Sequence, residues 1–364
     1  MVVNSEIASV RLHFTNVSGL GAVRLLQSLL PALVSHRHYF LEKVYIPLSD
    51  DWKDFILFAD ATELLVYKRY LPNTISRLLE CTLLGYRFDG DSPLLVLGDI
   101  PIKCKSKQTV FVQTTLLVQG ADTAGGLGAI KYWIARLLFR RNIRFVSNFI
   151  VQTEAMKLAI VKCYPEIQCP IYVIAQPAPS WLIKSELQRT VFNGNLDLGL
   201  RLFYPAANYP HKNHKILSKI NESAGWPVAE LLLTIPADLN PNESLHWITC
   251  LGKLEPAEVV EVYKNVDALI FLSLEESFGF PLVEAMWIGL PIICPDRPYA
   301  RTLCGEQAIY FDPNSSESLE VAVLKLFNLC NSGWWPDWSG SLENIPRDWE
   351  QVADSMFEIA ASAQ

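Results

Sequence analysis

The sequence lacks an apolar run long enough to cross a bilayer, and its first residues do not show the pattern of a signal peptide. Its eight cysteines are scattered, none forms a C-x-x-C pair, and no Cys/His spacing is typical of a zinc site. These absences predict a reduced, cytoplasmic protein without a structural metal. The formal net charge of −7 argues against nucleic acid as the main partner.

The length and the order of the predicted elements indicate an α/β protein with two domains. With 364 residues, half of them hydrophobic, the chain can build two cores of ordinary size. Strand-like apolar runs alternate with helical segments, which is typical of parallel sheets with helices on both faces. The predicted strands are Ile7–Phe14, Pro93–Gly98, Thr109–Gln113, Phe145–Val151, Ile171–Ala175, Leu198–Phe203, His246–Leu251, Ala268–Leu272 and Leu290–Cys294.

The best linker candidate is the stretch 176–197, because it is rich in proline, asparagine and glycine. We therefore predict one Rossmann-like domain over residues 1–180 and a second over residues 181–345. A helix over Trp349–Ala361 is predicted within a separate tail, residues 346–364.

The most informative pattern lies between two of the predicted strands, where a loop leads into a helix. Pro281 suits the first turn of that helix, which should run to Ile288 and stop at Gly289. This predicts one βαβ unit with an acidic, glycine-containing loop at the carboxyl end of its first strand. Open α/β sheets bind ligands at that edge.

The residues of this loop suit a ligand with phosphates and several hydroxyls. Gly279 permits close backbone approach, and the N–H groups at the helix start can hold phosphate oxygens. We expect Glu284 in the first helical turn to accept hydrogen bonds from a vicinal diol such as ribose, and Glu276 to face the group beyond the phosphates. Phe278 and Phe280 flank the glycine and join the expected donor site. A nucleotide sugar has both features; the alternative is a surface helix with solvated glutamates.

Two further loops of the second domain follow strands and should reach the same edge. Lys212 follows the strand Leu198–Phe203 and is a candidate cation for a diphosphate, where it would offset charge on the leaving nucleoside diphosphate. Gly252 and Lys253 follow the strand His246–Leu251. The alternative for either lysine is an ordinary solvated side chain.

These residues resemble a known family. The two carboxylates, Glu276 and Glu284, resemble the E-x7-E motif of the retaining glycosyltransferases of family 4, which have two Rossmann-like domains facing across a cleft, the GT-B fold. The resemblance is dense over residues 198–320 and thinner over the first half. Flanking segments resemble the family in the same order: Val266–Ser273, Gly289–Ile293 and Tyr310–Pro313.

The resemblance implies a retaining glycosyltransferase that moves a sugar from a nucleotide-sugar donor to a hydroxyl of a glycan or lipid-linked saccharide, with no metal and no cofactor. The donor would lie on the second domain and the acceptor mainly on the first, to which the tail would return. One alternative is a nucleotide-sugar epimerase of the same fold. Another is a non-catalytic subunit of a glycan-assembly complex, against which the intact Glu276, Glu284 and Lys212 argue.

One departure from the family concerns the phosphate site. The segment His211–Asn213 resembles the family's lysine-bearing segment, but the arginine that many relatives carry shortly before it is absent. Lys253 would then supply the second positive charge, or backbone N–H groups would stabilise the leaving group.

Candidates in the first half are weaker. Gly19 lies in a loop after the first strand, and the family's corresponding loop faces the diphosphate; a structural turn is the alternative, since no full G-x-G-x-x-G follows. Asp99 and Gln113 end two other strands and are acceptor-side candidates, although such residues more often cap loops.

Residues 131–145 combine five cations with large apolar residues and contain no acid. Basic helices with aromatic residues bind anionic membrane surfaces, which would place the protein at the inner face of the membrane. The alternative is a core-facing helix with a basic solvent face. The cations are Lys131, Arg136, Arg140, Arg141 and Arg144.

Overall fold

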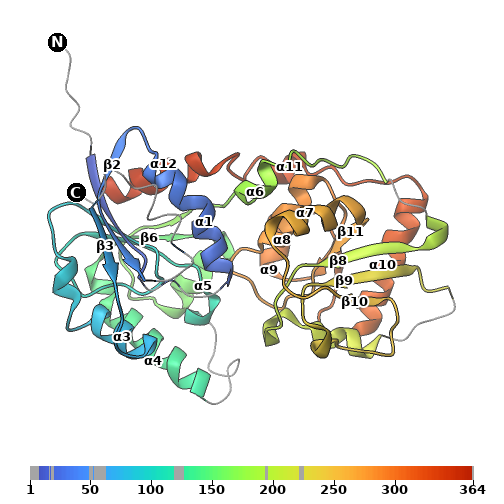
Figure 1. The fold of residues 1–364 in the computed structure, drawn as a ribbon, viewed down its shortest axis with the longest axis horizontal. Helices are drawn as coiled ribbons and strands as arrows, with labels where there is room; N and C mark the ends of the chain where they lie inside the picture. Colours follow the sequence, from blue (N-terminus) through green and yellow to red (C-terminus); the bar gives the residue numbers. More distant parts are fainter. Residues whose placement is uncertain are drawn as a thin grey trace, which may run out of the picture. The chain divides into compact units, whose positions relative to one another are not determined.

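The computed structural model describes residues 8–15, 17, 20–48, 52, 63–118, 127–192, 196–220 and 225–362. Its contacts divide the chain into two compact units, Met1–Gln176 with Pro346–Gln364, and Pro177–Ile345. Each unit is built on a wholly parallel sheet, so the predicted α/β class with two parallel sheets is confirmed. Figure 1 shows the elements of both units.

Unit 1 contains a seven-stranded sheet in the order β3-β2-β1-β4-β5-β6-β7. Its strands are β1 Ala8–His13, β2 Tyr39–Pro47, β3 Glu63–Tyr67, β4 Leu94–Val96, β5 Gln108–Phe111, β6 Val146–Val151 and β7 Ile171–Val173. Its longer helices are α1 Leu20–Val34, α3 Asn73–Cys81, α4 Leu127–Asn142, α5 Glu154–Cys163 and α12 Trp349–Ala361. Thr153 caps α5, because its side chain accepts a hydrogen bond from the Met156 N–H.

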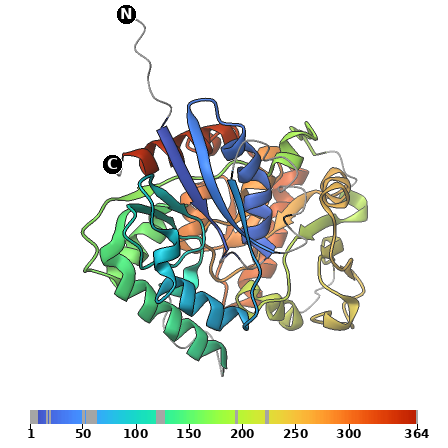
Figure 2. The same ribbon diagram turned by 60° about the vertical axis from the view of Figure 1, so that its left-hand side comes forward.

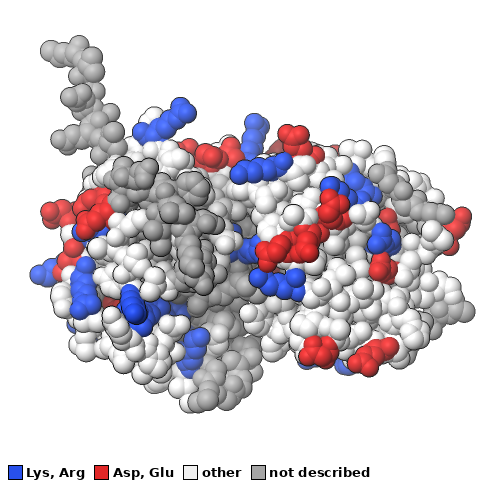
Figure 3. Space-filling model, in the orientation of Figure 1, with Lys and Arg blue, Asp and Glu red and all other residues white. Residues whose placement is uncertain are grey.

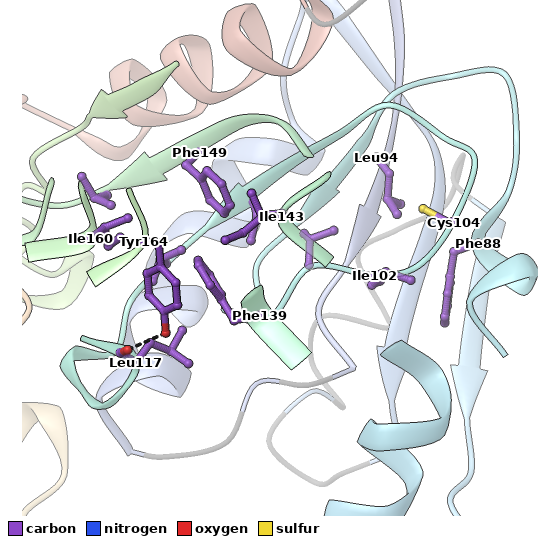
Figure 4. Close-up of a cluster of buried hydrophobic side chains, with 14 of the residues drawn as sticks. Phe88, Leu94, Ile102, Cys104, Leu117, Phe139, Ile143, Phe149, Ile160 and Tyr164 are labelled. Carbon is purple, nitrogen blue, oxygen red and sulfur yellow. Dashed lines mark hydrogen bonds between the residues drawn. The ribbon is translucent and has the colours of Figure 1, made fainter. Parts of the chain in front are cut away.

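Alternate residues of β6 face two different layers of unit 1. Phe149 packs with Phe139 of α4 and Tyr164 beyond α5, inside the buried cluster drawn in Figure 4, where the Tyr164 hydroxyl donates to the Leu117 carbonyl at 2.7 Å. The neighbouring Asn148 points the opposite way and donates to the Ile359 carbonyl of α12 at 3.0 Å. The two-residue period of the strand therefore places α4 and α5 on one face and α12 on the other.

The tail helix α12 completes unit 1. It packs against α1 and β1, and its Asp354 contacts the ring of His36, just after α1. Tyr39 stacks on Phe357 with ring centroids 5.1 Å apart. Residues from both ends of the described chain thus form one layer, visible beside α1 in Figure 1.

Unit 2 contains a six-stranded sheet in the order β10-β9-β8-β11-β12-β13. Its strands are β8 Leu200–Tyr204, β9 Val228–Leu233, β10 Ile248–Cys250, β11 Ala268–Ile270, β12 Ile292–Pro295 and β13 Ile309–Phe311. Its helices include α6 Ser180–Ile183, α7 Pro256–Asn265, α8 Phe280–Ile288, α9 Pro298–Cys304, α10 Ser316–Asn331 and α11 Ser339–Leu342.

Four strands were not predicted. β2 and β3 lie at one edge of the unit 1 sheet, where Lys43 pairs with Glu63, so charged residues interrupt the apolar pattern. β9 and β13 belong to the unit 2 sheet, where β13 is an edge strand. Both are short, mainly apolar runs that sequence periodicity does not separate from neighbouring segments.

Among the described helices, none combines the length and apolarity that a membrane span needs. On the face drawn in Figure 3, charges of both signs are scattered over the surface. In Figure 2, α3 and α4 run side by side along unit 1, in agreement with the contacts between them.

Candidate functional site

The candidate site of unit 2 is built from loops that leave the carboxyl ends of the neighbouring strands β8 and β11. The loop after β8 carries Lys212, and the loop after β11 carries Glu276. Two hydrogen bonds join these loops, since the His211 carbonyl accepts from the Leu274 N–H at 2.7 Å and from the Ser273 hydroxyl at 3.3 Å. The adjacency of β8 and β11 in the sheet therefore fixes the spacing of the two loops.

Lys212 and Glu276 contact each other directly, with Lys212 Nζ donating to Glu276 Oε1. Their side chains are 16% and 14% exposed, so the pair is shielded from water on most sides but still reachable. Lys212 Nζ also lies 5.7 Å from the centre of the Phe271 ring. A cation and a carboxylate thus lie together, largely shielded from water, at the carboxyl edge of the strands, where open α/β sheets generally bind ligands.

Buried side chains hold the backbone beneath this pair. The Tyr204 hydroxyl donates to the Lys212 carbonyl at 2.8 Å, and the Tyr299 hydroxyl donates to the Ser273 carbonyl at 2.5 Å. Burial, and next the charge of Glu276, raises the pKa of both phenols well above the ordinary value, so both stay protonated donors. Asn213 takes the left-handed conformation, with φ 54°, and donates to the Pro313 carbonyl at 3.2 Å.

The start of α8 lies in the same loop. Gly279 has φ 98°, a left-handed conformation that favours glycine, and the helix begins at Phe280 with Pro281 at its second position. The first N–H groups of such a helix can hold anionic oxygens. Phe278 is only 1% exposed and packs edge-to-face on Phe280, with ring centroids 5.2 Å apart, so its side chain serves the core.

Glu284 lies one residue beyond the first turn of α8, so the predicted first-turn position is wrong. The reason is that Gly279 caps the helix and α8 starts earlier than predicted. The side chain of Glu284 is 7% exposed, and its Oε2 accepts a hydrogen bond from the Tyr263 hydroxyl at 2.7 Å. The carboxylate is therefore held from the protein side and is not a solvated surface group.

The loop after β10, which carries Gly252 and Lys253, shows no described contact with the Lys212–Glu276 pair. Gly252 has φ 73°, which explains a glycine after β10. Lys253 is 68% exposed and pairs with Glu255 at 3.2 Å, an exposed pair that contributes little to stability. No described contact brings Lys253 to Lys212 or Glu276.

In unit 1, the acceptor-side candidates Asp99 and Gln113 form hydrogen bonds to backbone groups of the loops that follow β4 and β5. Asp99 has φ 65°, and its Oδ1 accepts from the Gln113 N–H at 2.6 Å and the Thr114 N–H at 3.1 Å. Burial raises the pKa of Asp99. The Gln113 amide donates to the Leu97 carbonyl at 2.9 Å. Gly19, the remaining donor-side candidate, lies outside the described residues.

The basic residues of α4 and its continuation divide into two groups. Arg136 is half-buried and donates to the Leu116 carbonyl at 3.1 Å, and Arg140 pairs with Glu166 at 2.7 Å and donates to the Cys163 carbonyl. Lys131, Arg141 and Arg144 are exposed. Three large apolar side chains also lie exposed on this helix, namely Ile130, Trp133 and Leu137.

Tyr263, Tyr204 and Tyr299 were also missed as site residues. All three are buried like ordinary core residues, and no residue pattern around them marks a site. Within the described part of the chain, no three His, Cys, Asp or Glu side chains gather closely enough to hold a metal ion.

Comparisons with known proteins show what this chain is similar to. Residues 239–331, which include α7, β11 and α8, match the family model of glycosyl transferases group 1. The whole chain superposes on sucrose-phosphate synthase from Thermosynechococcus elongatus with a TM-score of 0.65, at 12% identity and over 98% of each chain. It superposes on WaaG, a glycosyltransferase involved in lipopolysaccharide biosynthesis, with a TM-score of 0.61, at 15% identity over 97% of this chain and 98% of that one. The chain has the GT-B fold, and its predicted resemblance to GT-B glycosyltransferases is confirmed.

Particular relatives are more similar in sequence. The O-antigen chain mannosyltransferase RfbU of Salmonella typhimurium is 27% identical over 204 residues, which are 53% of this chain and 55% of that protein. The serotype-specific mannosyltransferase WbdA of Escherichia coli is 33% identical over 135 residues, which are 37% of this chain and 16% of that protein. The chain thus matches about half or less of the length of these curated relatives.

Proposed function

We propose that this protein transfers a sugar from a nucleotide-sugar donor to a hydroxyl of a glycan or lipid-linked saccharide, with retention of anomeric configuration and without a metal. The observation that carries the proposal is the Lys212–Glu276 pair beside the glycine-capped start of α8. It combines a cation, a carboxylate and helix N–H groups at the edge where α/β sheets bind ligands.

Each group has a task in such a transfer. The bond between the sugar's anomeric carbon and the diphosphate oxygen breaks, the acceptor oxygen bonds to that carbon, and the acceptor's proton passes to the departing diphosphate. Negative charge then grows on the nucleoside diphosphate, where Lys212 and the first N–H groups of α8 stabilise it. Glu276 accepts hydrogen bonds from the sugar, and Glu284 accepts them from the ribose diol.

The relatives suggest the first substrates to test. RfbU and WbdA are named as mannosyltransferases, RfbU as one that acts on O-antigen chains. We therefore propose a nucleoside-diphosphate hexose, mannose first, as donor and a growing surface glycan as acceptor. Asp99 and Gln113 remain acceptor-side candidates.

The experiment has two stages. A panel of UDP-, GDP-, ADP- and dTDP-sugars is screened for thermal stabilisation, because a ligand of the native state raises the melting temperature. The stabilising donor is then incubated with saccharide acceptors, and products are identified by mass spectrometry, with Lys212→Ala as the inactive control. A saccharide longer by one sugar supports transfer. An altered sugar still attached to its nucleotide, formed without acceptor, identifies an epimerase, and donor binding without any product identifies a non-catalytic subunit.

We also propose that unit 1 contacts an anionic membrane through α4. Ile130, Trp133 and Leu137 are 57%, 62% and 52% exposed, and their spacing of three and four residues places them on one outer face of the helix. The exposed cations Lys131, Arg141 and Arg144 flank that face, and no acid occurs from 127 to 153. Tryptophan between apolar and basic side chains suits the lipid interface.

The structure changes which cations this proposal uses. Arg136 and Arg140 hold α4 against residues 116 and 163–166, so their replacement would disturb the fold as well as any lipid contact. We therefore assign the lipid contact to the apolar outer face and to Lys131, Arg141 and Arg144. Arg140 is left out because, although 58% exposed, it pairs with Glu166. A membrane-bound enzyme of this kind would act at the inner face on a lipid-linked acceptor.

A further inference from the structure

Tyr263 and Glu284 form a buried contact that joins two helices of unit 2. Tyr263, on α7, is completely buried, and its hydroxyl donates to Glu284 Oε2 at 2.7 Å. Its ring packs edge-to-face on Phe203 of β8, with centroids 5.2 Å apart at 85°. The tyrosine is therefore fixed by the sheet on one side and directs its only polar atom at the carboxylate on α8.

The contact suits a carboxylate that is largely shielded from water. An ionised carboxylate is costly to bury unless hydrogen bonds satisfy it. Burial, and next the charge of Glu284, raises the pKa of Tyr263 well above its ordinary value, so the phenol remains a donor at every physiological pH. The Tyr263 hydroxyl can therefore donate to Glu284 throughout that range.

The contact also affects the conformation of Glu284. A carboxylate can accept several hydrogen bonds, and the Tyr263 hydroxyl supplies one of them at Oε2. A donor that holds the carboxylate from inside the protein selects one side-chain rotamer of Glu284, and it lowers the entropy lost when a diol binds.

We propose that Tyr263 is a positioning residue of the donor site, holding Glu284 in the orientation that receives the ribose diol. This inference rests on the proposed function, since it assumes that Glu284 meets a ribose. It adds that affinity for the diol depends on a side chain that never touches the nucleotide.

The test measures nucleoside diphosphate affinity by calorimetry for the wild type and Tyr263→Phe, using the base chosen by the thermal panel. Each protein is titrated with the ordinary nucleoside diphosphate and with its 2′,3′-dideoxy counterpart, which lacks the diol. We expect Tyr263→Phe to weaken binding of the diol-bearing nucleotide about three- to tenfold. Binding of the dideoxy nucleotide should stay unchanged within error.

Two further variants complete the design. Tyr164→Phe removes another buried phenol hydroxyl, one that donates to a backbone carbonyl in unit 1, and should leave both affinities unchanged. The double variant Glu284→Gln/Tyr263→Phe should bind the diol-bearing nucleotide nearly as well as Glu284→Gln alone, because the two residues act as one unit. Phe203→Leu keeps the hydroxyl but loosens the ring, and should give a smaller loss with the same dependence on the diol.

Several outcomes would overturn the inference. Equal losses for both nucleotides, or a lower melting temperature with unchanged affinities, would make the Tyr263 contact purely structural. If Tyr263→Phe does not fold, Phe203→Leu decides, and its affinities must still separate the two nucleotides. A wild-type protein that binds no nucleoside diphosphate would instead remove the proposed function, whereas a loss in Glu284→Gln without one in Tyr263→Phe would remove only this inference.

Discussion

Lys212 and Glu276, 64 residues apart in the sequence, form a direct ion pair between neighbouring loops of unit 2. The cation expected to meet a diphosphate is therefore already neutralised when no ligand is present. A bound diphosphate must compete with Glu276 for Lys212, and this competition leads to the first two predictions.

Lys212→Ala should lower kcat more than it lowers donor affinity, because charge on the leaving group grows toward the transition state. Loss of one such stabilising group costs about 100- to 1,000-fold in kcat. Steady-state kinetics with the donor chosen by the panel measure both parameters. A raised KM with unchanged kcat would show that Lys212 contributes only uniform binding.

Glu276→Gln should strengthen binding of the free nucleoside diphosphate, because the amide no longer competes for the Lys212 ammonium. We expect a gain of roughly three- to tenfold, about 1 kcal/mol, as for a partly exposed ion pair. Sugar transfer by the same variant should fall. Calorimetry decides: weaker nucleoside diphosphate binding would mean that Glu276 helps to hold the phosphates.

Replacing Lys131, Arg141 and Arg144 by Gln should release the protein from anionic vesicles, since each basic residue near such a surface contributes about 1 kcal/mol. Trp133→Ser should weaken binding at high salt too, because its contribution is not electrostatic. Flotation with phosphatidylglycerol-containing vesicles measures the bound fraction. The matched control replaces three exposed lysines of unit 2 by Gln, namely Lys215, Lys219 and Lys325. Wild-type protein that stays unbound at low salt would contradict the membrane proposal.

Gly289→Ala should destabilise unit 2 strongly. Gly289 ends α8 with φ 90°, and an added Cβ would lie 2.1 Å from the Arg189 carbonyl oxygen, so strain and overlap both arise. We expect a loss of more than about 2 kcal/mol in the free energy of unfolding. Gly333→Ala is the control, because Gly333 has φ 79° but open space around its Cβ position, so only strain of about 1 kcal/mol remains. Equal losses in the two variants would show that the Arg189 contact yields easily.

Acid should destabilise unit 2 through His214. Burial, and next the charge of Lys212, lowers the pKa of His214 from 6.5 to about 4, and a weaker interaction with the Ala206 backbone opposes the shift. Between pH 6.5 and about pH 4, His214 is protonated in the unfolded chain but stays neutral in the folded chain. The free energy of unfolding therefore decreases over this range as the pH falls, by about 3 kcal/mol in total. His214→Phe should flatten this part of the curve of unfolding free energy against pH. Parallel curves for variant and wild type would show that His214 titrates normally.

The sequence predicted the β11–α8–β12 unit closely, because apolar runs, a proline near the helix start and a glycine at its end coincide there. It placed Glu284 in the first turn of α8, but the helix starts earlier, at Phe280. A residue pattern does not reveal the left-handed conformation of Gly279 that sets this start. It placed Lys212 and Glu276 at one sheet edge but could not predict their contact, which depends on the adjacency of β8 and β11. Tyr263 gave no signal at all, because a tyrosine in an apolar helix face is ordinary core.

The return of α12 to unit 1 sets an order for folding during synthesis. All of unit 2, residues 177–345, leaves the ribosome before the helix that covers one face of the unit 1 sheet exists. Unit 2 can therefore fold first. Until α12 has been synthesised, the surface of unit 1 that α12 covers stays exposed. A ribosome stalled after residue 345 would present a folded unit 2 joined to an incomplete unit 1, a state exposed to chaperones and proteases for as long as the last helix is missing.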